Sequence, residues 1–394
     1  MKKKYLASVF ICTFLTITAF FSYDMYNFPS DYYNTTGENF RCVSAYPPAA
    51  ASAKYDEDGV YKSQLKLFGI LPIKTLNVTV LPKKYLIPSG QPFGIKLYTD
   101  GLLIIDMAQI VTQDGSSCNP AFDAGIRVKD ILCKANDTII TSNEQFARLV
   151  EDSGGKKMKL SIKRGALNFE VTVTPVRSSV DGEYKIGLWV RDSTAGIGTI
   201  TYYDPETSSF GGLGHGIYDV DTSELMTLRT SEPYFACINN VKKGRKGDPG
   251  ALLGYFTGNA FGKIYSNTNS GVYGKYDGKA EGTLVEVAYK QDIKTGPVQI
   301  LCTIDGSEPH LYAAEIIKLN MASEDGKNIM LKITDARLLE LTGGIVQGMS
   351  GSPIIQNGKL IGAVTHVLLN DPTRGYGIFI ENMMKASGQY QTAA

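Results

Sequence analysis

The segment that most constrains the fold is a glycine-rich turn followed by a tight hairpin, residues 342–366. Gly348 and Gly351 flank Ser350, and an apolar run with Asn357-Gly358 at its centre follows. Glycine lets the backbone bend sharply, and Asn-Gly favours a two-residue β-hairpin turn. A serine acts as a nucleophile when it has a base, an exposed turn and N–H donors for the oxyanion. The segment therefore predicts nucleophilic Ser350 on a β-sheet scaffold, with the Gly348 and Ser350 amides as oxyanion hole.

The segment resembles the Gly-Asp-Ser-Gly-Gly-Pro loop of chymotrypsin-like peptidases. This resemblance implies that Thr365 and His366 lie on a strand beside the substrate. It also implies that Gly375, Tyr376 and Gly377 face that strand across the specificity pocket.

Two neighbours of Ser350 need separate consideration. Met349 stands where chymotrypsin-like enzymes have an aspartate, so the new N-terminus that activates those enzymes would find no carboxylate here. Ser352 is a competing hydroxyl, but it precedes Pro353, where the chain leaves the turn. We therefore expect Ser350 to be the nucleophile.

The base must be one of three histidines. His215 lies between two glycines, which core packing does not explain but a close approach of other backbone or substrate does. His310 lies at a polar-to-strand transition and is predicted to be a surface residue, and His366 belongs to the strand beside the substrate. We expect His215 to be the general base.

The acid that would orient the histidine is less determined by position. Asp335 ends an apolar stretch shortly before the nucleophile turn, while Asp219 and Asp221 follow His215 closely and are suited to cap the next turn. From the residues alone, Asp335 is either the orienting acid or a solvated turn acid.

The N-terminus has the pattern of an exported chain. Three lysines, residues 2–4, precede an uncharged apolar stretch over residues 5–23, and no clean cleavage site follows. This predicts a membrane anchor helix over residues 1–23, with a cleaved signal peptide as the alternative. The bulk of the chain is expected outside the cytoplasm. Residues 24–64, rich in Tyr, Asn, Pro, Ala and Ser, are predicted to form an extended tether.

The middle of the chain predicts a peptide-binding module. A Gly/Pro turn opens into an apolar strand. It is followed by a short helix ending at Gly125, a helix over residues 143–151 with Asn143 as its predicted N-cap, and two strands. This order resembles a bacterial PDZ domain of α+β type. In that resemblance the carboxylate-binding loop is formed by Pro92, Phe93, Gly94 and Ile95.

Composition excludes several other classes. Lys plus Arg (40) balance Asp plus Glu (39), so no overall field favours nucleic acid. The six cysteines and three histidines show no metal-ligand spacing, so we expect free thiols, mostly buried, and neither metal nor cofactor. Frequent glycine and alternating apolar runs predict a mostly β protein.

Taken together, the motifs resemble the stage IV sporulation protein B peptidase family of spore-forming bacteria. The resemblance carries the family's triad onto His215, Asp335 and Ser350. It implies self-cleavage near the N-terminus, which would release the bulk of the chain from the anchor. It also implies cleavage of a regulator of a membrane-embedded protease, in the space between the two spore membranes. The alternatives are a catalytically idle anchored scaffold and a general quality-control protease of the cell envelope.

The expected fold is mostly β, with an N-terminal anchor helix, a PDZ-like α+β domain and a trypsin-like double β-barrel. The corresponding boundaries are an anchor at 1–23, a tether at 24–64, a strand segment at 65–89, a PDZ-like domain at 90–178 and a peptidase domain at 179–394.

Overall fold

The computed structural model describes residues 28–44, 49–219, 223–226, 230–323 and 326–388, together with Thr13 and Thr16. Within this part of the chain no helix is long and apolar enough to cross a membrane. The fold class is therefore corrected: the protein is mostly β, as expected, but the anchor helix is not part of the observed fold. The predicted anchor, residues 1–23, lies outside the described residues apart from those two threonines.

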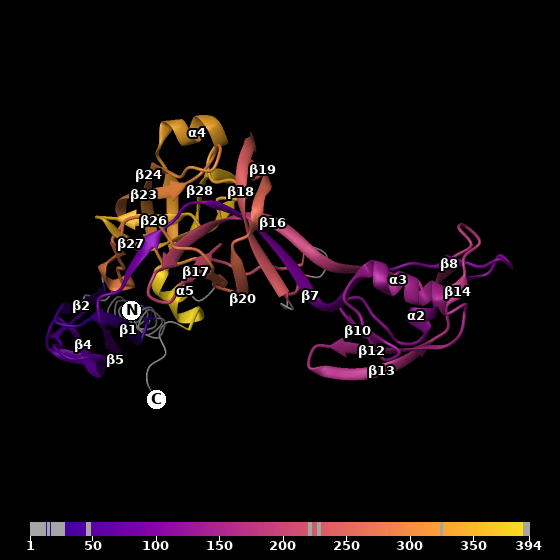
Figure 1. The fold of residues 1–394 in the computed structure, drawn as a ribbon. Coiled ribbons are helices and arrows are strands. Elements are labelled where there is room, and N and C mark those ends of the chain that lie inside the picture. Colours follow the sequence, from indigo (N-terminus) through magenta and orange to yellow (C-terminus); the bar gives the residue numbers. More distant parts are fainter. Residues whose placement is uncertain are drawn as a thin grey trace, which may run out of the picture.

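A five-stranded sheet forms the N-terminal part of the structure (Figure 1). Alternating residues of its strands, among them Tyr32, Phe40, Leu65 and Leu76, are buried on one face. Such alternation is what a half-buried sheet requires. The predicted tether is thus wrong over most of its length, because these residues have a core of their own. The strands are β1 (Asp31–Thr35), β2 (Asn39–Ser44), β3 (Ala49–Lys54), β4 (Gly59–Leu67) and β5 (Leu71–Leu81).

A small α+β lobe, residues 102–190, projects to one side (Figure 1). Phe146 and Val150 of its longer helix pack onto buried strand residues. That helix is capped by Ser142, whose side chain accepts a hydrogen bond from Gln145 N, and not by Asn143 as predicted. The elements are β8 (Ile110–Val111), β9 (Ser117–Cys118), α2 (Pro120–Asp123), β10 (Ile131–Ala135), β11 (Thr138–Ile139), α3 (Asn143–Asp152), β12 (Met158–Arg164), β13 (Leu167–Val173), β14 (Val176–Arg177) and β15 (Tyr184–Lys185).

Two long strands connect this lobe to the rest of the protein. β7 (Pro92–Met107) and β16 (Leu188–Asp204) pair antiparallel from the Pro92–Thr199 pair at one end to the Met107–Leu188 pair at the other. The lobe is therefore inserted between two strands of the N-terminal half of the peptidase, whereas the sequence had placed it as a separate domain ahead of the peptidase.

The same two strands belong to a thirteen-stranded sheet, whose strands outside the lobe form the N-terminal half of the peptidase. Its core is rich in aromatic side chains. The rings of Phe93 and Phe210 pack edge-to-face, with 6.0 Å between their centroids. Its remaining strands outside the lobe are β6 (Tyr85–Pro88), β17 (Ser209–Gly212), β18 (Thr230–Lys242), β19 (Ala251–Ala260), β20 (Gly262–Thr268), β21 (Gly271–Tyr276) and β22 (Val285–Glu286).

The C-terminal half is a closed six-stranded barrel. Asn357 and Gly358 both have positive φ, as a two-residue hairpin turn requires, and this confirms the predicted hairpin. The strands are β23 (Gly296–Cys302), β24 (His310–Leu319), β25 (Ile329–Ile333), β26 (Pro353–Gln356), β27 (Lys359–Leu368) and β28 (Asp371–Phe379), and the helices are η1 (Lys290–Asp292), α4 (Ala336–Thr342) and α5 (Ile380–Ala386).

Candidate active site

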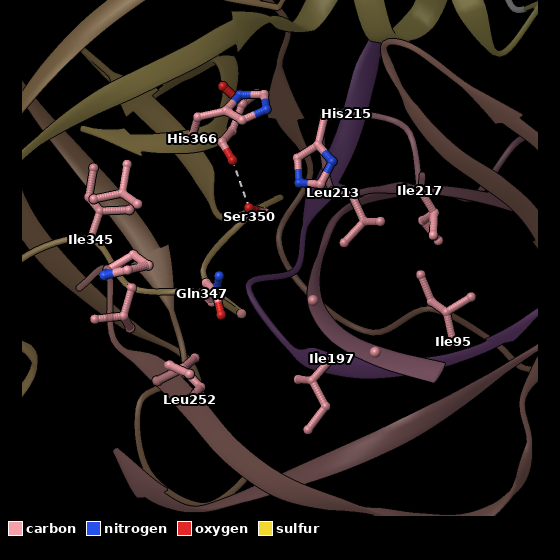
Figure 2. A pocket seen from close by; sticks show the side chains of 18 of the residues that line it. Ile95, Ile197, Leu213, His215, Ile217, Leu252, Ile345, Gln347, Ser350 and His366 are labelled. Carbon is pink, nitrogen blue, oxygen red and sulfur yellow. Dashed lines mark hydrogen bonds between the residues drawn. The ribbon is translucent and has the colours of Figure 1, made fainter. Parts of the chain in front are cut away.

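A cleft of about 890 Å³ lies between the two halves of the peptidase. His215 comes from the N-terminal half, and Ser350 and His366 come from the C-terminal barrel (Figure 2). The structure thus brings the predicted nucleophile and the predicted base, which are 135 positions apart in the chain, into one cleft.

The turn that carries Ser350 depends on its glycines. Gly348 and Gly351 have φ values of 99° and 98°, in a region that side chains disfavour. A Cβ atom at position 351 would lie 2.0 Å from the carbonyl oxygen of Thr199. The turn therefore needs glycine at this position both for its backbone conformation and for its contact with β16.

Threonines of β16 hold the turn in place. Thr199 donates its hydroxyl to the Gly348 carbonyl (2.8 Å) and its amide to the Ser350 carbonyl (2.9 Å). The Thr201 hydroxyl donates to the Gly351 carbonyl (2.7 Å). With these carbonyls engaged, the Gly348 and Ser350 amides donate to no backbone carbonyl within the described chain. Both N–H groups are therefore available for an oxyanion.

The two serines of the turn differ in their surroundings. Ser350 lines the cleft, and its Oγ donates to the Thr365 carbonyl (2.7 Å). Ser352 is completely buried, and its Oγ donates to the Met349 carbonyl (2.6 Å). Because only the first hydroxyl can meet a substrate, the geometry favours Ser350 as the nucleophile.

The glycines beside His215 allow close packing. A Cβ at Gly214 would lie 2.9 Å from Thr365 Cγ2, and one at Gly216 would lie 2.5 Å from Leu225 Cδ1. The histidine loop can therefore sit against the C-terminal barrel on one side and against its own turn on the other.

One ring nitrogen of His215 is bound to backbone. Nδ1 lies 2.8 Å from the Gly216 carbonyl oxygen, which can only accept, so Nδ1 carries the proton and Nε2 is left as an acceptor. Burial lowers the pKa of this imidazole, and the hydrogen bond to Gly216 opposes the shift only in part. In Figure 2 the imidazole faces Ser350. The tautomer is the one that a general base for serine requires.

The segment after His215 is held by a buried ion pair. Asp219 has a fully buried side chain, and its carboxylate lies 2.8 Å from the Arg191 guanidinium of β16. The structure therefore gives Asp219 a partner other than His215. Asp221, the other nearby acid, lies outside the described residues.

Asp335 is not brought to His215. It is the N-cap of α4: its carboxylate accepts hydrogen bonds from the amides of Leu338 (3.0 Å) and Ala313 (3.1 Å). Partial burial acts to raise the pKa of this carboxyl, but these backbone hydrogen bonds lower it below its usual value. Asp335 does not line the cleft, so the triad implied by the family resemblance is not assembled in this structure.

The capping role of Asp335 gives a prediction about stability. We expect Asp335→Ala to lower the free energy of unfolding by about 1 kcal/mol, because it leaves the Leu338 amide of α4 and the Ala313 amide of β24 without their acceptor. Asp335→Asn should keep most of that stability, since asparagine caps about as well as aspartate. Urea unfolding of the two variants measures the difference, and equal losses would contradict the capping role.

The predicted specificity residues divide into two groups. Thr365 and His366 line the cleft, and the His366 ring lies 5.0 Å from the His215 ring between centroids. The residues of β28, namely Gly375, Tyr376 and Gly377, pair with β25 and β27 and do not line the cleft. His310 is exposed on β24, as predicted.

The predicted carboxylate-binding loop is corrected by the structure. Pro92, Phe93, Gly94 and Ile95 lie in β7 and are paired with β16 on one side, and Phe93, Gly94 and Ile95 are paired with β18 on the other. No loop forms there, because pairing uses the backbone groups that would bind a carboxylate. Ile95 instead lines the peptidase cleft.

Sequence reasoning missed the residues that support the site from a distance. Thr199, Thr201 and Arg191 belong to a strand whose alternating pattern resembles that of any other strand, so only their contacts show what they hold. All five described cysteines are free thiols, but only Cys42 and Cys302 are buried. No cluster of potential metal ligands occurs among the described residues.

Comparison with known proteins adds to this geometry. Among curated proteins, none matches the chain. Among solved structures, the PDZ domain of the SdrC-like protein Lmo2051 from Listeria monocytogenes is similar at 18% identity over 23% of this chain and 87% of that one, with a TM-score of 0.19. The Rv3671c protease from M. tuberculosis is similar in its active form at 15% identity over 51% and 78% of the two chains, with a TM-score of 0.29. The inactive form of the same protease is similar at 14% identity over 50% of this chain and 85% of that one, with a TM-score of 0.31.

The family comparison covers the catalytic region itself. The SpoIVB peptidase S55 family matches residues 182–384, just over half of the 394 residues. This range contains both His215 and Ser350. The chain therefore belongs to the SpoIVB peptidase S55 family and is a serine peptidase.

Proposed function

We propose that this serine peptidase is an endopeptidase of spore formation that cleaves itself and a regulator of a membrane-embedded protease, in the space between the two spore membranes. The family to which the chain belongs supports the setting. The observation that carries the chemistry is that Ser350 and His215 line one cleft, with Nε2 of the histidine unprotonated.

The proposed reaction is acyl transfer. The Ser350 hydroxyl leaves the Thr365 carbonyl, gives its proton to His215 Nε2 and attacks a peptide carbonyl. The Gly348 and Ser350 amides stabilise the oxyanion, and His215 then protonates the leaving amine. Water repeats the cycle on the acyl-enzyme. The Gly216 carbonyl keeps the imidazole in the required tautomer, in the place where many serine peptidases use a carboxylate.

Self-cleavage is tested by mass spectrometry of the N-terminus of the full chain. We expect wild type to lose an N-terminal segment and Ser350→Ala to keep it, because the variant lacks the nucleophile. Adding wild type to the intact variant should restore the truncation. The same truncation in both proteins on their own would mean that another protease makes the cut.

A fluorophosphonate probe separates the peptidase from an idle scaffold. Wild type should be labelled at Ser350 and Ser350→Ala should not. Wild-type enzyme that reacts with the probe is then incubated with unfolded proteins. Broad digestion of these proteins would indicate a general protease and contradict a signalling role.

A further inference from the structure

The wall of the cleft on the side of Ser350 away from His215 is apolar apart from Gln347. The base protonates the leaving amine, so the leaving group lies on the His215 side and the acyl part of the substrate lies on the other. In Figure 2, Ile345 and Leu252 occupy that other side. The side chain of the residue whose carbonyl is attacked must therefore lie against these residues.

Around Ile345 and Leu252 the described lining offers no carboxylate, ammonium or guanidinium group to pair with a charged side chain. None of the described residues that line the cleft is Asp, Glu, Lys or Arg, and its two imidazoles are those of His215 and His366. Around Ile345 and Leu252 the lining continues with Val346, Val367 and Leu369. A charged group placed there would lose water without gaining an ion pair, whereas an apolar group would gain from burial.

This wall is preformed and rigid. Ile345, Val346 and Leu252 are 2%, 1% and 5% exposed, and they belong to one buried cluster with the core side chains of the C-terminal barrel. Backbone hydrogen bonds from the amide of Ile345 to the Pro372 carbonyl and from that of Leu252 to the Gln347 carbonyl, both 2.8 Å long, fix it. Its shape can therefore discriminate between side chains by size.

Ile345 limits the depth of this space. A Cβ at Gly375 would lie 2.6 Å from Ile345 Cδ1, so the isoleucine fills the region that Gly375 borders. A smaller residue at position 345 would open that region.

We propose that the cleft selects substrates with an uncharged, apolar residue immediately before the scissile bond, and that Ile345 sets the largest side chain accepted. This inference rests on the proposed peptidase chemistry and adds its substrate class. A pocket of this kind discriminates by about 10- to 200-fold for each methylene that fits or fails to fit.

The test compares peptides that differ only in the residue before the cleaved bond. With wild type we expect kcat/KM to be on the order of a hundredfold higher for Val, Leu or Met than for Lys, Arg, Asp or Glu. Equal or better cleavage after a charged residue would overturn the inference.

Variants at Ile345 test its role in size selection. Ile345→Ala should raise the ratio of Phe to Val cleavage by about tenfold, and the milder Ile345→Val should shift it in the same direction. Ile361→Ala is the matched control, because Ile361 is 1% exposed in the same core but does not line the cleft. Ile361→Ala should leave the ratio of Phe to Val cleavage unchanged. If Ile361→Ala shifted this ratio as much as Ile345→Ala does, the role of Ile345 would be overturned.

Binding separates this inference from the peptidase chemistry. Ser350→Ala, which cannot form an acyl-enzyme, should bind the same peptides with apolar ranked above charged. If wild type cleaves nothing but this ranking holds, the proposed function fails and the apolar selection stands. If wild type cleaves peptides but Ser350→Ala binds charged and apolar peptides equally well, or binds none, the apolar selection fails and the proposed peptidase function stands.

Discussion

Replacing Ser350 with alanine is expected to lower kcat/KM for peptide substrates by about 10⁴- to 10⁶-fold, because no other hydroxyl of the turn reaches the cleft. The loss should be in catalysis and not in folding. Ser350 Oγ makes one described hydrogen bond, to the Thr365 carbonyl, and its removal costs about 1 kcal/mol of stability. Peptide turnover measured beside urea unfolding separates the two effects.

Ser352→Ala is the matched control for this variant. Ser352 also donates one hydrogen bond to a backbone carbonyl, but it is fully buried and faces no cleft. We expect a similar small loss of stability and cleavage within about tenfold of wild type. Loss of cleavage in Ser352→Ala with retention in Ser350→Ala would reverse the assignment.

Replacing His215 with alanine is expected to lower kcat/KM by a similar factor and to remove the acidic limb of the pH profile. In wild type, only the neutral imidazole can accept the serine proton, so activity rises as pH increases through the pKa of His215. Burial lowers this pKa, so the midpoint of the limb should lie below about 6.5, the ordinary value for histidine.

The controls for His215 are the other two histidines. His310→Ala, on the exposed end of β24, should leave both the rate and the midpoint unchanged. His366→Gln should leave the acidic limb in place, because His366 is not the base. A limb that persists in His215→Ala would show that another group is the base, and a midpoint well above 6.5 would contradict the effect of burial.

The inserted lobe gives the peptidase an unusual construction. β7 and β16 run from the core of the lobe to the cleft, and their pairing shifts register at two places on the way. At the cleft, Ile95 and Ile197 line the wall and Thr199 holds the nucleophile turn. The lobe is therefore continuous with strands that support the site directly. A separate domain ahead of the peptidase, which the sequence suggests, would be joined to it by a linker alone.

Local chemistry made part of the site predictable from sequence. The glycines around Ser350 and His215 permit positive φ and close approach whatever surrounds them, and Asn357-Gly358 specifies its own turn. These features depend on residues within a few positions of one another. The same is true of the alternating patterns that indicated a mostly β protein.

Contacts between distant residues decided the rest. A strand pattern does not name its partner, so the pairing of Pro92 with Thr199 and the five-stranded sheet over residues 31–81 could not be derived from spacing. Asp335 has the position of a triad acid in the sequence, yet in the fold its carboxylate caps the N-terminus of α4. The sequence by itself determined which groups are chemically suited to hydrolysis. Only the tertiary structure decided which of them meet, because pairing and burial depend on the whole chain.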